Sequence, residues 1–378
     1  MRWSQSSFKF IIVVLCGASL ICCRSAVVAG SRAAGVRAGV QTVRAGNRSY
    51  RCNVVTLDLT KVQPRVVIAN SGVGRTEPFL RMIQRSHAVA AVNGSFFEAY
   101  TQSGDKDPDM TLIHNGQVVH KGSIGSVIGF GEDGAVMGQL DLHIRGTVSS
   151  LRRRETEWYA YWLNRTPHSD ASITLFTPAR GAKTRAAGGM SVIVENGIVV
   201  EVARGDAAIP ANGFVIQFQS EEERQTRNFP PGARVEYHIE RKSATDSAAW
   251  KTVREAVGAG PRLVTDGRIT VDADKEGFVD QKILVSSGQR SAIGIDAKQN
   301  IFLVTVRGAT VIELAHVMQL LGCRQAMNLD GGASSALYCN GQMITRPGRD
   351  LSNILAFIPR QQHCILQGNC LPHSFLRN

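Results

Sequence analysis

Aromatic residues, long apolar runs and metal-type cysteine spacings are all scarce in this sequence. Phe, Trp and Tyr make up 6% of the 378 residues, which argues against a porin-like barrel with aromatic girdles. No Cys-x-x-Cys or Cys/His pattern with zinc spacing occurs. Hydrophobic residues at 43% and charged residues at 20% are typical of a globular protein. Disordered, collagen-like and coiled-coil chains are therefore excluded.

The sequence has fewer acidic than basic residues, with 31 Asp and Glu and 43 Lys and Arg, and its formal net charge is +12. Arg accounts for 33 of the basic residues, and its planar fork suits phosphate and carboxylate groups. An Arg-rich genome explains the same bias. The arginines are dispersed, and the one tight run, Arg152 to Arg154, has no aromatic-rich platform beside it. We therefore expect no nucleic-acid partner.

The N-terminus has the order of a secretory signal. Arg2 and Lys9 precede an apolar stretch at 10–23, and small residues follow at 27–29. Residues 1–29 are predicted to be a signal peptide. An uncleaved anchor is the alternative, although 14 residues fall short of the roughly 20 needed to span a bilayer. No later stretch is long and apolar enough to cross a membrane. We expect a secreted or periplasmic protein that meets the membrane only through this signal or anchor.

Five cysteines remain after the signal, and in an exported protein they are disulfide candidates. They are Cys52, Cys323, Cys339, Cys364 and Cys370. A local bridge between Cys364 and Cys370 is plausible because the two are close together in a polar tail. An odd number leaves one cysteine unpaired or paired between chains.

The chain divides into four parts by composition. Residues 1–29 are the signal, 30–48 lack an apolar period and are expected to be a linker, 49–360 form one domain, and 361–378 are a polar, Cys-containing tail. Within the domain, five Asn-Gly or Asp-Gly dipeptides each lie between apolar runs, which predicts β-hairpins. These dipeptides begin at Asn115, Asp133, Asn196, Asp266 and Asn340.

Helices are predicted at only a few places. Pro78 to Arg85 is one candidate. Val311 to Leu321 is the clearest, because Thr310 and Glu313 form a capping box and an apolar face follows. Strands with a few helices predict an α+β fold of antiparallel-rich mixed sheets with a few packed helices.

Two further glycine dipeptides do not fit a simple hairpin. Asn93-Gly94 follows the apolar run 88–92, and Asp330-Gly331 follows residues 325–329. Each indicates a buried strand that ends in a polar loop, where polar groups can converge on a pocket. Asn328 and Asp330 would project to the same side of a strand.

The loop after Asp330 contains Gly331, Gly332, Ser334 and Ser335. The glycines would allow a ligand to approach the backbone, and successive N–H groups there could form an anion nest. A tight turn capped by Asp330 is the competing interpretation. Arg290 opens an otherwise apolar strand, and such an Arg is usually paired with a carboxylate or an anionic ligand.

Several segments together resemble the phosphodiester glycosidase family, whose best-known member is the lysosomal "uncovering enzyme", N-acetylglucosamine-1-phosphodiester α-N-acetylglucosaminidase, and which has many exported bacterial members. The resemblance covers roughly residues 50–359. The matching stretches are 91–97, 258–263, 290–296, 328–335 and 349–352. Ala333 stands where a third glycine is common.

The resemblance implies cleavage of a sugar-1-phosphodiester between the anomeric carbon and the phosphate oxygen. Asp330 is then the nucleophile or base, and Arg290 and Arg349 are candidates to hold the phosphate. The other expected site residues play three parts. Asn93 and Asn328 would bind sugar hydroxyls or orient Asp330; Gly331, Gly332 and Ser334 would form the nest; and Phe96 and Phe97 would form an apolar wall or belong to the core. Glu98 is the available second carboxylate.

No cofactor is required by this pattern. Asp330, Asn328 and Glu98 are a hard oxygen set that could take Mg²⁺ or Ca²⁺, but a recognisable metal spacing is lacking. The expected partner is a sugar phosphate or a glycan built with such links, for example in an envelope or exopolysaccharide. Two alternatives stay open: a non-catalytic carbohydrate- or envelope-binding protein, and a metal-dependent phosphodiesterase that cuts the P–O bond. Gly-x-Ser-x-Gly does not occur around Ser334, so a serine hydrolase has little support.

Overall fold

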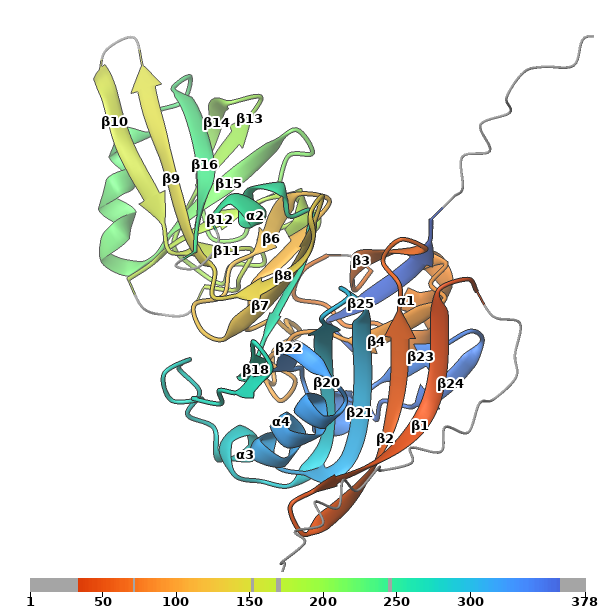
Figure 1. Cartoon of the computed structure of the whole chain (residues 1–378). Helices are drawn as coiled ribbons and strands as arrows, with labels where there is room; N and C mark the ends of the chain where they lie inside the picture. The colour runs from red at the N-terminus through yellow and green to blue at the C-terminus, as the bar shows by residue number, and fades with distance from the viewer. Residues whose placement is uncertain (1–32, 71, 151–152, 168–170, 244–246, 361–378) are drawn as a thin grey trace, which may run out of the picture.

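The computed structural model describes residues 33–70, 72–150, 153–167, 171–243 and 247–360. The chain folds into two lobes built almost entirely of β-sheet (Figure 1). Strands make up 49% and helices 13% of the structure. The sheets are antiparallel-rich as expected, but β-structure dominates more than the label α+β implies.

The larger lobe contains two sheets that face each other across a common core. The first has seven strands, in spatial order β1 (Val36–Ala45), β2 (Arg48–Leu57), β21 (Ile301–Ala309), β20 (Gly288–Asp296), β22 (Cys323–Asn328), β18 (Arg262–Thr265) and β19 (Arg268–Ile269). The second has five, in the order β24 (Gln342–Thr345), β23 (Leu337–Cys339), β4 (Ala90–Asn93), β25 (Asn353–Pro359) and β3 (Val62–Ile68).

A third sheet lies between the two lobes. Its order is β6 (Gln117–His120), β5 (Leu112–His114), β17 (Glu255–Ala259), β7 (Ser126–Gly131) and β8 (Gly134–Gly138). Successive side chains of a strand point to opposite faces. Leu112 and Val257 accordingly pack into the core of the larger lobe, while Ile113 and Ala256 pack into that of the smaller one. The two cores therefore share this sheet.

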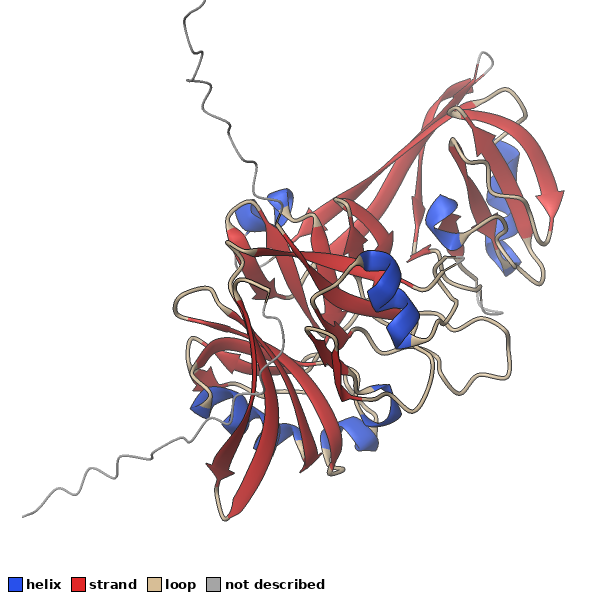
Figure 2. Cartoon of the chain, turned by 90° about the vertical axis from the view of Figure 1, so that its right-hand side faces the viewer, coloured by secondary structure: helices blue, strands red, loops and turns tan. Residues whose placement is uncertain are grey.

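The smaller lobe is one eight-stranded sheet. Its order is β10 (Arg153–Ala160), β9 (Asp141–Ser150), β16 (Arg234–Lys242), β14 (Ile198–Arg204), β13 (Met190–Glu195), β15 (Gly213–Phe218), β12 (Ile173–Phe176) and β11 (Trp162–Leu163). Figure 2 shows these strands projecting from the rest of the molecule. Among the strand pairs of the described residues, only β11 and β12 are parallel.

Helices are short and lie on the outer faces of the sheets. They are α1 (Phe79–Ser86), α2 (Ser247–Thr252), α3 (Gln281–Leu284) and α4 (Val311–Leu320), with 3₁₀ turns η1 (Pro178–Arg180), η2 (Ser220–Asn228) and η3 (Gly332–Ser334). The capping box of Thr310 and Glu313 is present at α4, which confirms the predicted helix start. Among the described residues, no helix is long and apolar enough to cross a membrane.

All five predicted hairpin turns are confirmed. They join β5 to β6, β7 to β8, β13 to β14, β18 to β19 and β23 to β24, each an antiparallel pair. In contrast, Asn93-Gly94 lies at the end of β4, and Asp330-Gly331 follows β22. Both dipeptides lead into loops, as the sequence predicted.

Residues 36–45 do not belong to a linker, which corrects the expectation for 30–48. They form β1, which pairs with β2 from Val36 opposite Leu57 to Ala45 opposite Arg48. β1 is an edge strand, and only Val36, Val43 and Ala45 are buried along it. The strand therefore lacks the regular apolar alternation, and backbone pairing decides its structure. The signal at 1–29 and the tail at 361–378 lie outside the described residues.

Cys52, Cys323 and Cys339 are buried free thiols, so the expectation that they form disulfides is wrong. Burial raises the pKa of Cys52 and of Cys323 to about 12. These side chains act as small apolar groups in the core. Cys364 and Cys370 are outside the described residues.

Candidate active site

Asp330 lies in the loop after β22 and is held mainly through its backbone. Its N–H donates to the carbonyl of Gly94 at 3.2 Å, and its carbonyl accepts from the side-chain amide of Asn93 at 2.6 Å. Asn93 also accepts from the N–H of Ala336 at 3.0 Å. The two non-hairpin dipeptides are therefore joined directly. Asn93 is 1% exposed, so it orients the Asp330 loop and is not available to bind a sugar.

The Asp330 side chain is partly buried, and its carboxylate lies in a mixed electrostatic environment. Burial raises its pKa to about 6. Hydrogen bonds from Ser334 and the Gly331 N–H act in the opposite direction, as does the charge of Arg349, while Asp109 adds to the rise. The Gly331 N–H to Oδ1 distance is 2.8 Å. A carboxylate tuned in this way can exchange protons near neutral pH.

The glycine loop differs from the expected anion nest. The Gly331 N–H is used by Asp330, and the N–H groups of Ser334 and Ser335 donate to the carbonyls of Gly331 and Gly332. These bonds give the loop the features of the capped turn in the competing interpretation, and they leave the N–H groups of Gly332 and Ala333 outside the bonds described for the loop. Ser334 is 2% exposed and serves Asp330.

Asp109 is a site residue that the sequence reasoning missed. It is partly buried, and burial raises its pKa to about 6, with the charges of Glu98 and Asp107 adding to the rise and Arg165 opposing it. Its N–H donates to the carbonyl of Phe96 at 2.9 Å, next to the Asn93 motif. A sequence signal exists, because Asp105, Asp107 and Asp109 alternate like the residues of a strand.

Glu98 is not an isolated second carboxylate. Its Oε1 accepts from the guanidinium of Arg165 at 3.1 Å, and the guanidinium lies 4.8 Å from the centre of the Trp162 ring. Arg165 follows β11 of the smaller lobe, so this lobe contributes a residue to the surroundings of Glu98. Arg165 is thus paired with Glu98, and its charge also opposes the rise in the pKa of Asp109.

Two cations lie next to the ring of Tyr100, near Asp330. Arg349 donates to the Tyr100 hydroxyl at 2.7 Å, and its guanidinium lies 4.7 Å from the ring centre. The ammonium of Lys282, on α3, lies 5.4 Å from the same ring. The hydrogen bond and charge of Arg349 lower the pKa of Tyr100, and Asp330 is close enough to oppose this shift. Arg349 was predicted from the sequence, whereas Tyr100 and Lys282 were missed.

Arg290 differs from its expected role in phosphate binding. It is 5% exposed and donates to four backbone carbonyls, those of Lys282, Ile283, Ser286 and Ala309. These carbonyls take the place of the carboxylate or anionic ligand that Arg290 was expected to need as a partner in an apolar strand. Burial lowers the pKa of Arg290 below its ordinary value.

Asn328 and the two phenylalanines also turn inward. The Asn328 amide is fully buried and donates to the carbonyl of Gly260 at 2.8 Å, which fixes the turn after β17. Phe97 is 9% exposed and packs in the core with Met82. Phe96 is partly buried, with its ring centre 6.1 Å from that of Phe278. Of the two, only Phe96 is placed to form part of a wall.

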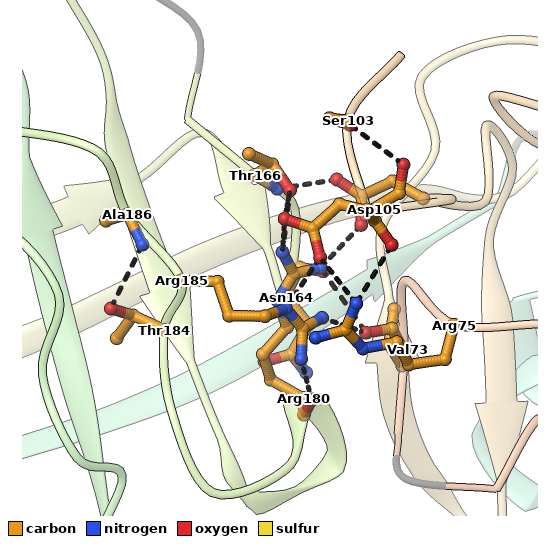
Figure 3. Close-up of polar contacts among 12 residues, drawn as sticks. Val73, Arg75, Ser103, Asp105, Asn164, Thr166, Arg180, Thr184, Arg185 and Ala186 are labelled. Carbon is orange, nitrogen blue, oxygen red and sulfur yellow. Dashed lines mark hydrogen bonds and ion pairs between the residues drawn. The ribbon is translucent and has the colours of Figure 1, made fainter. Parts of the chain in front are cut away.

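An ionic network involves Asp105 and Asp107, which belong to the same segment as Glu98, Tyr100 and Asp109. Figure 3 shows the network around Asp105 and Arg180. Arg180 is fully buried and pairs with Asp107, also fully buried, and with Asp105 at 3.3 Å. Burial disfavours the charged form of Asp107, but Arg180 and Thr166 together hold its pKa below the ordinary value. The Thr166 N–H donates to Asp107 at 2.6 Å. The network thus connects this segment to the smaller lobe beside Arg165.

Two of the three oxygen side chains named for a metal have other contacts. The Asn328 amide nitrogen donates to the Gly260 carbonyl, while its Oδ1 is buried without a hydrogen-bond partner among the described residues, and Glu98 accepts from Arg165. Within the described residues, no group of three or more His, Cys, Asp or Glu side chains is arranged to hold a metal ion.

Comparison with known proteins gives the family. The family model for phosphodiester glycosidases matches residues 188–358, which include Lys282, Asp330 and Arg349. This part of the chain belongs to the phosphodiester glycosidase family. The resemblance seen in the sequence motifs is confirmed for the stretches that lie within residues 188–358. No curated protein matches the chain.

Three solved structures are similar to this chain. A hypothetical protein from Synechocystis has a TM-score of 0.76 at 23% identity, over 86% of this chain and 62% of that one. A putative exported protein from Burkholderia pseudomallei has 0.68 at 22%, over 82% and 74%. The zebrafish N-acetylglucosamine-1-phosphodiester α-N-acetylglucosaminidase catalytic domain has 0.47 at 13%, over 89% and 88%. The chain spans about three fifths of the Synechocystis protein, and the first two similarities concern the fold alone.

Proposed function

We propose that the protein hydrolyses a sugar-1-phosphodiester between the anomeric carbon and the phosphate oxygen. The observation that carries this proposal is the carboxylate of Asp330, tied through its backbone to Asn93 at 2.6 Å, with the charges of Asp109 and Arg349 acting on it in opposite directions. Burial raises the pKa of Asp330 and of Asp109 to about 6. Glycoside hydrolysis generally uses two carboxylates that flank the scissile bond. The family match over 188–358 supports the same chemistry.

Cleavage of this bond depends only weakly on general acid catalysis. The C1–O bond breaks, the phosphate monoester leaves with the bonding electrons, and water supplies the hydroxyl that forms on C1. A phosphate oxygen is already a good leaving group, so its protonation contributes less than in an ordinary glycoside. Asp330 acts as nucleophile or base, and Asp109 is the second carboxylate. Arg349 stabilises the negative charge that develops on the leaving phosphate.

The local structure suits this role. The backbone of Asp330 is tied to Asn93 and Gly94 by bonds of 2.6 and 3.2 Å, so its carboxylate has little freedom to move. Pre-organisation of this kind lowers the cost of reaching the reactive geometry. We further propose that the protein is exported, because residues 1–29 have the pattern of a secretory signal, and that the substrate is an envelope or exopolysaccharide glycan.

The test is hydrolysis of a panel of sugar-1-phosphodiesters by the mature protein in ¹⁸O-labelled water. We expect the label in the sugar and none in the phosphate. Label in the phosphate would show P–O cleavage and favour a phosphodiesterase. Binding of the panel without turnover would favour a carbohydrate-binding protein. The Asp330→Asn variant is the control for contaminating hydrolases.

A further inference from the structure

The phosphoryl group of the substrate needs a site with more charge than one arginine supplies. We infer that Lys282 and Arg349, brought together on Tyr100, form a two-cation phosphoryl site, and that Arg290 positions Lys282 within it. The inference rests on the proposed function, because it names the residues that would hold the leaving group. It assigns binding to Lys282 and Tyr100, and it replaces the expected direct role of Arg290 with an indirect one.

Geometry brings the two cations to one ring. Lys282 and Arg349 are 67 positions apart in the sequence, yet their charged groups lie 5.4 and 4.7 Å from the Tyr100 ring centre. Tyr100 is 80% exposed, so a solute can reach this place. The electron-rich ring face offsets part of the repulsion between the two like charges.

The charge balance points to an anion at this place. Neither Lys282 nor Arg349 has an ion pair in the described part of the chain. Arg165, the cation whose charge acts on Asp109, is instead paired with Glu98 at 3.1 Å. An incoming phosphodiester would have to displace a carboxylate from Arg165, but not from Lys282 or Arg349. The Tyr100 side is therefore the one that accepts the phosphate.

The two-cation site also lies near Asp330. The charge of Arg349 acts on Asp330, and Asp330 in turn acts on Tyr100. A phosphate held by Arg349 and Lys282 would place its ester-linked sugar carbon beside the carboxylate pair. A guanidinium fork and an ammonium together match the several oxygens of a phosphodiester.

Arg290 secures the short helix that presents Lys282. α3 has four residues, Gln281–Leu284, and a helix of that length has no stability of its own. The Arg290 guanidinium donates to the carbonyls of Lys282, Ile283 and Ser286 at 3.2, 3.3 and 2.6 Å. At the N-terminus, the carboxylate of Asp280 accepts from the Lys282 N–H at 2.8 Å. Both ends of α3 are thus fixed, and Arg290 acts as a positioning residue.

The experiment measures binding of inorganic phosphate to the mature protein by calorimetry, apart from any turnover. We expect Lys282→Ala and Arg349→Ala each to weaken phosphate binding by about tenfold, the loss of one charge-assisted hydrogen bond, and Lys282→Arg to retain it. Lys275→Ala is the matched control, because Lys275 is an exposed lysine in the segment before α3. Lys282 is exposed too, so its variants should fold normally.

A double-variant cycle tests the positioning role. Arg290→Lys should weaken phosphate binding as much as Lys282→Ala, and the two changes combined should weaken it no further. Additive effects would overturn the indirect role of Arg290. Absence of phosphate binding in the parent, unchanged binding in Lys282→Ala, or an equal loss in Lys275→Ala would overturn the site itself. Phosphate binding that depends on Lys282 without any turnover would instead contradict the proposed function and leave the anion site standing.

Discussion

The side-chain amide of Asn93 donates to the backbone carbonyl of Asp330 at 2.6 Å, across 237 positions of sequence. The same side chain accepts from the Ala336 N–H at 3.0 Å. One buried residue at the end of β4 therefore fixes the whole loop that carries the candidate catalytic carboxylate. Its contribution to the site is orientation of the backbone, with no direct contact to a substrate.

Asn93→Asp should reduce turnover strongly. The change keeps the size of the side chain but replaces the donor nitrogen with an oxygen that faces the Asp330 carbonyl. We expect a loss of stability of about 1–3 kcal/mol from the unsatisfied buried groups, and a fall in kcat that exceeds the change in KM. Urea unfolding and steady-state kinetics measure both. Asn340→Asp, in the β23–β24 turn where Asp is tolerated, is the control, and a fully active Asn93→Asp would contradict the orienting role.

Asp330→Asn should abolish turnover without unfolding the protein. If the carboxylate is the nucleophile or base, kcat should fall by roughly 10³ or more. The pKa is raised from 3.8 to about 6, so the ionised form destabilises the folded state above that pH. Asparagine should therefore stabilise the protein at pH 8 by about 1–2 kcal/mol, after a discount for partial exposure, and the gain should vanish below pH 3.8. A folded, active variant would remove Asp330 from the mechanism.

Activity should rise with pH through an apparent pKa near 6. The base must be ionised, and the pKa values of Asp330 and Asp109 are both raised to about 6, so the observed value belongs to the pair. Asp109→Asn removes a negative neighbour and should lower the apparent pKa of the remaining carboxylate. The pH dependence of kcat/KM for both proteins is the measurement. An unchanged pKa in an active Asp109→Asn variant would show that the two carboxylates do not interact.

Arg180→Met should destabilise the protein by about 3–5 kcal/mol, because it leaves the carboxylate of Asp107 buried without its partner. The loss should diminish as the pH falls and Asp107 becomes protonated. The double variant Arg180→Met with Asp107→Asn should be more stable than Arg180→Met alone at pH 8. Thermal unfolding of the three proteins at two pH values provides the comparison, and equal stabilities of the single and double variants would show that the pair is not coupled.

Local patterns in the sequence were sufficient for much of the secondary structure. Five Asn-Gly and Asp-Gly turns, the capping box at Thr310 and the two strand ends at Asn93 and Asp330 were all predicted, because each depends on residues close together in the chain. β1 was missed because an edge strand takes its structure from a partner, β2, and shows little apolar alternation of its own. The buried thiols were mistaken for disulfide candidates because no sequence pattern reports distance.

The motifs of the chain by themselves predicted that Asp330, Asn93 and Arg349 belong to one site, and they indicated the family whose model matches residues 188–358. Only the tertiary structure decided what each side chain does. The Arg290 guanidinium donates to backbone carbonyls in and after α3, and Glu98 pairs with Arg165. The N–H of Asp109 donates to the carbonyl of Phe96, which places Asp109 near the Asn93 motif. A sequence records which groups are charged, but their partners lie tens to hundreds of positions away. Which partner each charged side chain contacts is therefore decided by tertiary packing.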